Sequence, residues 1–360
     1  CDLMTGAPRG RLHPITLQPV EWTWTRNYGC NTPSASEHLM TFRSGAAGFF
    51  DLARDGGTGN FGGFRSGCTN NLIVAGGLLN APDYTRTCIC AYQNQASVAL
   101  VPMADAEMWT FFGSTDVKGP IKRLGVNLGA PGDRRADDGT LWVEHPSVGG
   151  KSPSAPISVD GKIEYFRVHS SRIGGVGIPW VAASGAKGIT SLTLTLDKDS
   201  QQDQPCTVRL HFVEPDGAKP GDRVFDIRLQ GQDVLKDFDI AKEAGGGDRA
   251  LVKEFTTQAG KELKVKLVPR RSVPVLCGIE VYAGGAEPSA AKSDAMPDAN
   301  VLHTALTVPE SAVMLRPPGE EARSESEGTT LRSFLWVVVG ALLFMWVFFR
   351  FGLIGRNKAA

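Results

Sequence analysis

The chain has 360 residues, of which 42% are hydrophobic and 21% are charged, and its formal net charge is zero. Its basic residues are scattered rather than clustered, which argues against nucleic acid as a partner. The 42 glycines and 22 prolines favour short strands and many turns over long helices, and the length suggests two domains.

The first residue is Cys1 rather than methionine. Three origins stay open: a fragment of a longer protein, a product of signal-peptide cleavage, and a lipoprotein whose first cysteine carries lipid. We favour the fragment, because the first residues resemble part of a unit that begins upstream.

Residues 1–115 alternate short apolar runs with glycine-rich turns. The runs 38–42 and 49–52 are joined by a glycine-containing link, and the runs 72–75 and 78–81 are joined by Gly-Gly. This pattern predicts one β-hairpin after another.

Four strings in this region resemble the closing part of bacterial proteins with PQQ-like β-propeller repeats: SEHLMTFRSGAAGFFDL, GGTGNFGGFRSGCTNNLI, LLNAPDYTRTCICAYQNQASVAL and EMWTFFG. The resemblance implies partial propeller blades over 1–115, as in quinoprotein dehydrogenases or outer-membrane assembly scaffolds, with further blades upstream. No complete cofactor or calcium site is visible, so we expect no cofactor here, and PQQ only if upstream blades hold it. Asp51, Asp83 and Arg86 are possible ligands, for which loop-fixing salt bridges are the favoured role.

The seven cysteines lie before residue 285, and an oxidising compartment would let them pair. Cys88 and Cys90 are not expected to pair with each other, because alternate side chains of a strand point apart. Each should instead reach Cys30 or Cys68. The Cys-Ile-Cys spacing is too short for the usual zinc knuckle, so no metal site is expected.

Residues 118–284 show a clearer strand pattern. Within 207–213, Val208, Leu210 and Phe212 face one side, and 263–267 alternates strictly. Many antiparallel strands without helices predict a β-sandwich. Cys206 and Cys277 are the last two disulfide candidates, and they are expected to pair if their strands are neighbours.

Four strings in this segment resemble a malectin domain: RLGVNLGAPGDRRADDGTLW, CTVRLHFVEPDGAKPGDRVFDIRLQGQDVLKDFDI, ALVKEF and VPVLCGIEVYA. The resemblance implies a jelly-roll type of sandwich that binds carbohydrate without catalysis. The chain departs from the animal malectin pattern, whose binding face is rich in tyrosine, since it has only five tyrosines.

Sugar rings present an apolar face that aromatic side chains cover and a rim of hydroxyls that carboxylates, amides and arginine bind. The carbohydrate-binding candidates in loops are Asp133, Arg134, Asp137, Asp138, Trp142, Tyr165, Phe166 and Trp180. For the two tryptophans, core or edge packing is the favoured role. Asp226, Asp237 and Asp239 are equally compatible with turn-stabilising roles. We interpret His211 as packing in a polar pair with Glu214.

No catalytic residue is assigned, since no pair of carboxylates stands out and no GxSxG, HExxH or P-loop string occurs.

The C-terminal part contains sixteen uncharged residues, 334–349, which is short of the ~20 that cross a bilayer. Because Arg350 can snorkel, we predict a transmembrane helix over 333–354. The basic tail 355–360 should then be cytoplasmic and the rest periplasmic or on the cell surface, with 285–332 as a flexible stalk.

The sequence-based fold class is therefore mostly β: partial propeller blades, a malectin-like sandwich and a single transmembrane helix. The favoured function is a membrane-anchored carbohydrate-binding protein. The alternatives are the C-terminal fragment of a quinoprotein-like oxidoreductase and a protein-binding membrane scaffold.

Overall fold

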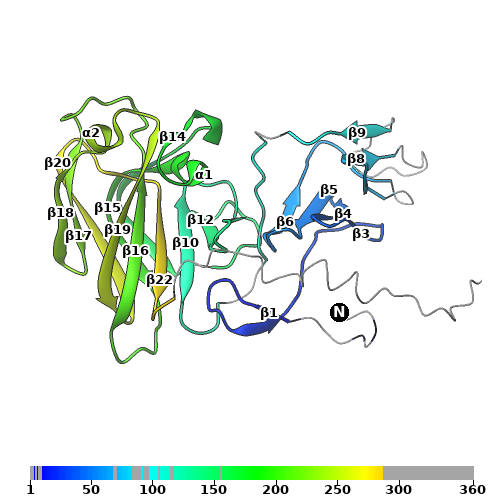
Figure 1. Cartoon of the computed structure of the whole chain (residues 1–360), viewed down its shortest axis with the longest axis horizontal. Coiled ribbons are helices and arrows are strands. Elements are labelled where there is room, and N and C mark those ends of the chain that lie inside the picture. Colours follow the sequence, from blue (N-terminus) through cyan, green and yellow to red (C-terminus); the bar gives the residue numbers. More distant parts are fainter. Residues whose placement is uncertain are drawn as a thin grey trace, which may run out of the picture. The chain divides into compact units, whose positions relative to one another are not determined.

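A computed structural model of the chain describes residues 10–67, 71–82, 97–103, 106–113, 117–154 and 156–286, together with Met4, Gly6 and Ala91. These residues are mostly β, as predicted (Figure 1). Their helices are short: η1 (Ser170–Arg172), α1 (Pro179–Ala182) and α2 (Ile240–Ala244).

The N-terminal part forms separate antiparallel sheets of two, four and three strands, each with its strands in chain order. The strands are β1 (Gly10–Leu12), β2 (Pro19–Glu21), β3 (Ser34–Ala35), β4 (Leu39–Ser44), β5 (Ala46–Asp51), β6 (Gly57–Asn60), β7 (Ile73–Ala75), β8 (Leu78–Ala81) and β9 (Val98–Leu100).

The remaining strands form two larger sheets. The seven-stranded sheet runs in the order β11 (Arg134–Arg135), β12 (Leu141–His145), β10 (Arg123–Leu128), β22 (Gly278–Ala283), β16 (Gln204–Phe212), β19 (Arg249–Ala259) and β14 (Gly174–Gly175). The second sheet runs β13 (Ile157–Arg167), β15 (Ser184–Thr195), β20 (Glu262–Arg271), β17 (Val224–Leu229) and β18 (Gln232–Phe238), and β21 (Val275–Leu276) pairs with β15. Neighbouring strands are antiparallel except β10 with β12 and β14 with β19.

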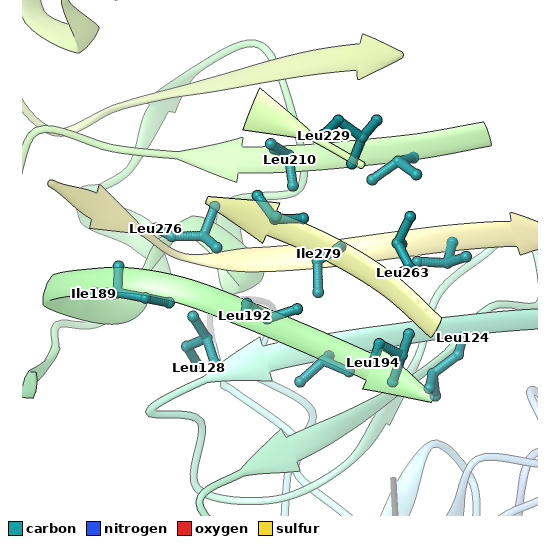
Figure 2. Packing of buried hydrophobic residues seen from close by; sticks show 14 of the residues in the cluster. Leu124, Leu128, Ile189, Leu192, Leu194, Leu210, Leu229, Leu263, Leu276 and Ile279 are labelled. Carbon is teal, nitrogen blue, oxygen red and sulfur yellow. The ribbon is translucent and has the colours of Figure 1, made fainter. Parts of the chain in front are cut away.

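Hydrophobic alternation explains why these two sheets face each other. In β20, Leu263, Val265 and Leu267 are buried while the residues between them are exposed. In Figure 2, Leu210 and Ile279 of the seven-stranded sheet meet side chains of the second sheet. Burial of each such side chain contributes about 1.5–3 kcal/mol, so this shared face is what holds the layers together. The predicted β-sandwich is therefore confirmed.

The sandwich core also takes side chains from the N-terminal part. Ile15 and Phe112 belong to the same buried cluster as Leu124 of β10 and Leu194 of β15. The backbone amides of residues 122 and 123 both donate to the carbonyl oxygen of Ile15, at 2.8 and 3.0 Å. The sandwich thus depends on residues well before its first strand.

The predicted propeller is not formed by the described residues. A propeller repeats four-stranded blades around a channel, whereas the strands between residues 10 and 100 form one sheet each of two, four and three strands. The prediction was wrong because it rested on the resemblance of four strings to propeller repeats. Short strands joined by glycine turns also occur in other small antiparallel sheets, and such strings do not specify what each sheet packs against.

The predicted membrane-spanning fold and single-pass localisation are also corrected. Among the described residues, no helix is long and apolar enough to cross a membrane. The described α-helices α1 and α2 have four and five residues, where a bilayer needs ~20. The predicted anchor 333–354, the tail 355–360 and nearly all of the stalk lie outside the described residues.

The predicted disulfide between Cys206 and Cys277 is absent, and both cysteines are buried free thiols. Cys206 is on β16, and Cys277 directly precedes the neighbouring strand β22. However, Cys206 lies opposite Ala283, whereas the amide of Cys277 donates to the carbonyl oxygen of His211. Cys206 and His211 lie five positions apart on β16, about 16 Å at 3.3 Å per residue, well beyond disulfide reach.

The other cysteine predictions stay predictions. Cys30 is exposed, with its Sγ 3.0 Å from the Tyr28 hydroxyl. Cys1, Cys68, Cys88 and Cys90 lie outside the described residues, as do Asp83 and Arg86.

Candidate functional site

Three indole rings pack edge to face at one end of the seven-stranded sheet, and we call Trp109, Trp142 and Trp180 the tryptophan cluster. The centroid of Trp180 lies 6.0 Å from that of Trp109 and 6.0 Å from that of Trp142, with interplanar angles of 87° and 85°. Trp142 is fully buried, whereas Trp109 and Trp180 are half-buried. The cluster therefore runs from the sheet towards solvent.

Two glycines make room for Trp142 against the sheet. A Cβ atom on Gly125 of β10 would lie 2.3 Å from the Trp142 ring, and one on Gly278 of β22 would lie 2.9 Å from it. Trp180 is held by α1, which begins with Pro179 at its first position, where the missing amide hydrogen costs nothing.

Arg134 of β11 lies on this cluster. The Cζ atom of its guanidinium is 4.8 Å from the ring centroid of Trp180 and 5.9 Å from that of Trp109, within range of a cation–π contact. Burial, and then the charge of Arg54, lower the pKa of Arg134. A small recess beside it is lined by Asp51, Arg54, Met108, Thr110, Arg134 and Arg135.

Glu107 fixes the outer end of the cluster. Its carboxylate accepts hydrogen bonds from the Ser170 amide at 2.6 Å and from Trp109 Nε1 at 3.3 Å. Burial acts to raise the pKa of Glu107, but the hydrogen bonds from Ser170 and Trp109 outweigh it and the pKa is lowered. Glu107 thus stays ionised and ties the tryptophan cluster to η1.

The structure gives the three predicted aspartates different positions. Asp133 is fully buried and accepts hydrogen bonds from the amides of Phe112 and Glu144, and burial raises its pKa to about 7. Asp138 accepts from the Thr140 amide and the Tyr282 hydroxyl. Asp137 is exposed and pairs with Arg54 at 3.0 Å. Asp133 and Asp138 therefore fix the backbone and the sheet.

Tyr165 and Phe166 lie on β13, an edge strand of the second sheet. Tyr165 is 39% exposed, and partial burial raises the pKa of its hydroxyl. Phe166 is half-buried and packs against the core. The chain leads from β13 through η1 to α1, and Val168 pairs with Ala183, so Tyr165 and Trp180 flank one connection.

Other polar residues singled out in the sequence stabilise the fold. Asp226 accepts from the Asp237 amide and pairs with Arg270. The Asp239 side chain caps α2 by accepting from the Lys242 amide. Asp51 accepts from the Arg54 amide and is buried, which raises its pKa.

His211 is not paired with Glu214, which instead binds Arg223 at 2.7 Å. Its ring lies edge to face against Trp142, with the centroids 4.9 Å apart. Its Nε2 atom is 4.0 Å from a carboxylate oxygen of Glu280 and has no hydrogen-bond partner among the described residues.

The sequence interpretation missed Trp109, Glu107 and Arg54. They lie in the segment assigned to a propeller, 71 residues or more before Trp180. The available signal was local: EMWTFFG combines an acid with four apolar side chains, three of them aromatic, which is unusual for an exposed linker.

A comparison with protein families identifies part of the sandwich. Residues 193–272 match the family model of the malectin domain. This segment extends from β15 to the end of β20, so it includes strands of both sheets of the malectin-like sandwich. The resemblance seen in the sequence is therefore confirmed for these residues.

Among curated proteins, the chain is similar to Receptor-like protein 4 of Arabidopsis thaliana, with 33% identity over 137 residues. The match covers 37% of this chain and 21% of that protein, so the chain spans about a fifth of the length of this relative.

Two solved structures illustrate more distant similarity. The β-glucuronidase of Bacteroides uniformis is 16% identical, with 45% of this chain and 18% of the enzyme covered and a TM-score of 0.36. The extracellular domain of ANXUR2 from Arabidopsis thaliana is 18% identical, with 47% and 52% covered and a TM-score of 0.36.

Proposed function

We propose that the malectin-like sandwich binds carbohydrate without catalysis. The observation that carries the proposal is the malectin match of residues 193–272. The partly exposed aromatic rings of the sandwich support it, because such rings cover the apolar face of a sugar.

Tyr165 is the aromatic ring with the most open position among the predicted candidates. It lies on an edge strand, where no further strand covers that side of the sheet. Gly129 is its neighbour: a Cβ atom there would be 3.5 Å from the Tyr165 ring. A glycine beside an exposed ring leaves space for a ligand, and the Tyr165 hydroxyl can exchange hydrogen bonds with sugar hydroxyls.

The tryptophan cluster offers a second contact at the same connection. Trp180 is half-buried, with one ring face occupied by Arg134. Arg134 provides donors for hydroxyl oxygens beside that ring. We therefore propose Tyr165, Trp180 and Arg134 as the ligand-contacting residues, and Trp142 and Phe166 as their packed support.

The proposal is tested by measuring binding of the full chain to a panel of oligosaccharides by calorimetry, followed by Tyr165→Ala. We expect at least one saccharide to bind and Tyr165→Ala to weaken it about tenfold, the size of a lost ring contact. Tyr28→Ala is the matched control, since Tyr28 is 67% exposed but lies in the N-terminal part.

Tyr165→Phe separates the ring from the hydroxyl and should keep most of the affinity. Absence of binding to every saccharide by folded protein would overturn the proposal. Equal loss in the Tyr165 and Tyr28 variants would remove Tyr165 from the site.

A further inference from the structure

The Arg134 guanidinium lacks the partner that a half-buried arginine usually has. It makes no hydrogen bond or ion pair within the described part of the chain, and its close contacts there are with the indole rings of Trp180 and Trp109. A cation–π contact uses the charge of the guanidinium and does not occupy its N–H donors. The tryptophan cluster thus contacts the Arg134 guanidinium without occupying its N–H donors.

The recess beside Arg134 is lined by two further arginines. Arg135 is already engaged, since it donates to the backbone oxygens of Arg54 and Gly139 and lies 3.5 Å from Asp55. Arg54 is different, because its Nε donates to Asp137, whose side chain is 89% exposed. A pair this exposed is weak, so Arg54 can exchange it for a ligand.

The acids near the recess do not cancel this charge locally. The carboxylate of Glu107 is engaged by Ser170 and Trp109, and that of Asp137 points to solvent beside Arg54. Asp51 is buried and accepts the Arg54 amide. None of the three makes an ion pair with Arg134 within the described part of the chain, although their charges act on it from further away. An incoming anion would therefore meet a guanidinium that no described carboxylate contacts.

We propose that Arg134, with Arg54, binds a carboxylate group of an acidic saccharide at the recess beside the tryptophan cluster. This inference rests on the proposed carbohydrate binding and names the class of sugar. A carboxylate matches the two parallel donors of a guanidinium, and arginine is favoured for such bidentate contacts. Arg134 is half-buried, and partial burial strengthens such a charged pair relative to one that is fully in water.

The test compares pairs of oligosaccharides that differ only in glucuronate or glucose at one position. Binding of each to the full chain is measured by calorimetry at low and high salt. We expect the wild-type protein to bind the acidic member at least about tenfold more tightly, as a charged hydrogen-bonded pair allows. This preference should decrease at high salt, whereas binding of the neutral member should not change.

Arg134→Gln should abolish the preference for the acidic sugar over its neutral counterpart. The readout is the ratio of the two affinities, because Arg134 is also proposed to contact sugar hydroxyls and its loss should weaken the binding of both members. Arg134→Lys should keep part of the preference for the acidic sugar, because lysine retains the charge but lacks the planar guanidinium with its paired donors. Arg54→Gln should reduce the preference and provides a second variant if Arg134→Gln does not fold. Arg228→Gln is the matched control, since Arg228 pairs with Asp233 on β17 and does not line the recess.

Two results would overturn the inference, and they differ in what they mean for the proposed function. If neutral and acidic members bind equally, or if the Arg134 and Arg54 variants keep the preference, the carboxylate site is wrong while carbohydrate binding stands. If neither member of any pair binds, carbohydrate binding fails and the inference fails with it.

Discussion

Asp55 and Arg135 are separated by 80 residues in the sequence, yet Asp55 Oδ2 lies 3.5 Å from Arg135 Nη1. The same carboxylate accepts from Arg11 Nη1 at 2.6 Å and from Trp22 Nε1 at 3.0 Å. Asp55 thus joins β11 of the sandwich to the segment around β1 and β2.

Replacing this carboxylate should destabilise the protein strongly. Asp55→Asn removes the charge that compensates Arg11, whose side chain is largely buried. Leaving such a charge unpaired costs about 3–5 kcal/mol, which should appear as a lower free energy of unfolding in denaturant at pH 7. Asp137→Asn is the control, since its exposed pair with Arg54 should contribute less than about 1 kcal/mol. Equal effects of the two substitutions would contradict the role of Asp55.

Because the core is shared, substitutions at residues outside the sandwich strands should destabilise the sandwich. Phe112→Ala should cost about 3–5 kcal/mol, because it leaves a cavity in the cluster that contains Leu124 and Leu194. Ile15→Val should cost about 0.5–1.5 kcal/mol in the same cluster. Both are measured by denaturant unfolding. An exposed control, Val176→Ala, should change little. Unchanged stability of Phe112→Ala would show that the sandwich is complete without it.

Because His211 is buried, we expect the free energy of unfolding to depend on pH. Burial, and then the charge of Arg209, lower its pKa to about 3, whereas an unfolded histidine titrates near 6.5. The folded state therefore binds this proton less tightly than the unfolded state. The contribution of His211 to the free energy of unfolding is constant above pH 6.5. Below that pH it is lost by about 1.4 kcal/mol per pH unit, down to about pH 3.

The measurement compares wild type and His211→Gln in denaturant at pH 7.5 and pH 5. Acidification should cost the wild type about 2 kcal/mol more than the variant. The comparison matters because Asp133, with its pKa raised to about 7, acts in the opposite sense and stabilises the folded state as the pH falls. The same pH dependence in both proteins would show that His211 is protonated in the fold.

The strands of the sandwich were predictable because alternation of buried and exposed residues is a local pattern. Val208, Leu210 and Phe212 faced the core as expected. Asp133, a predicted ligand candidate, is buried and accepts hydrogen bonds from two backbone amides. This position was not predictable, since a loop acid near aromatic residues has the same local pattern whether it binds sugar or backbone amides. Trp109 was missed because its contact with Trp180 depends on how distant segments pack, which periodicity does not record.

The N-terminal sheets show the same limit. The hairpins between residues 38 and 81 were found at the expected places, because turn glycines mark them. Their predicted assembly into propeller blades was not found, because assembly depends on which faces of the sheets are buried and on what they pack against. The short helices, by contrast, agreed with the glycine- and proline-rich composition.

The close approach of Trp142 to Gly125 and Gly278 has a consequence for how this protein can evolve. No side chain fits at 125 while the indole occupies its present place. The three positions should therefore vary together among relatives, with residues larger than glycine at 125 or 278 found only where position 142 carries a smaller residue. A lineage that loses Trp142 loses the inner ring on which Trp180 rests, and its outer rings are then free to take a new arrangement and a new ligand preference.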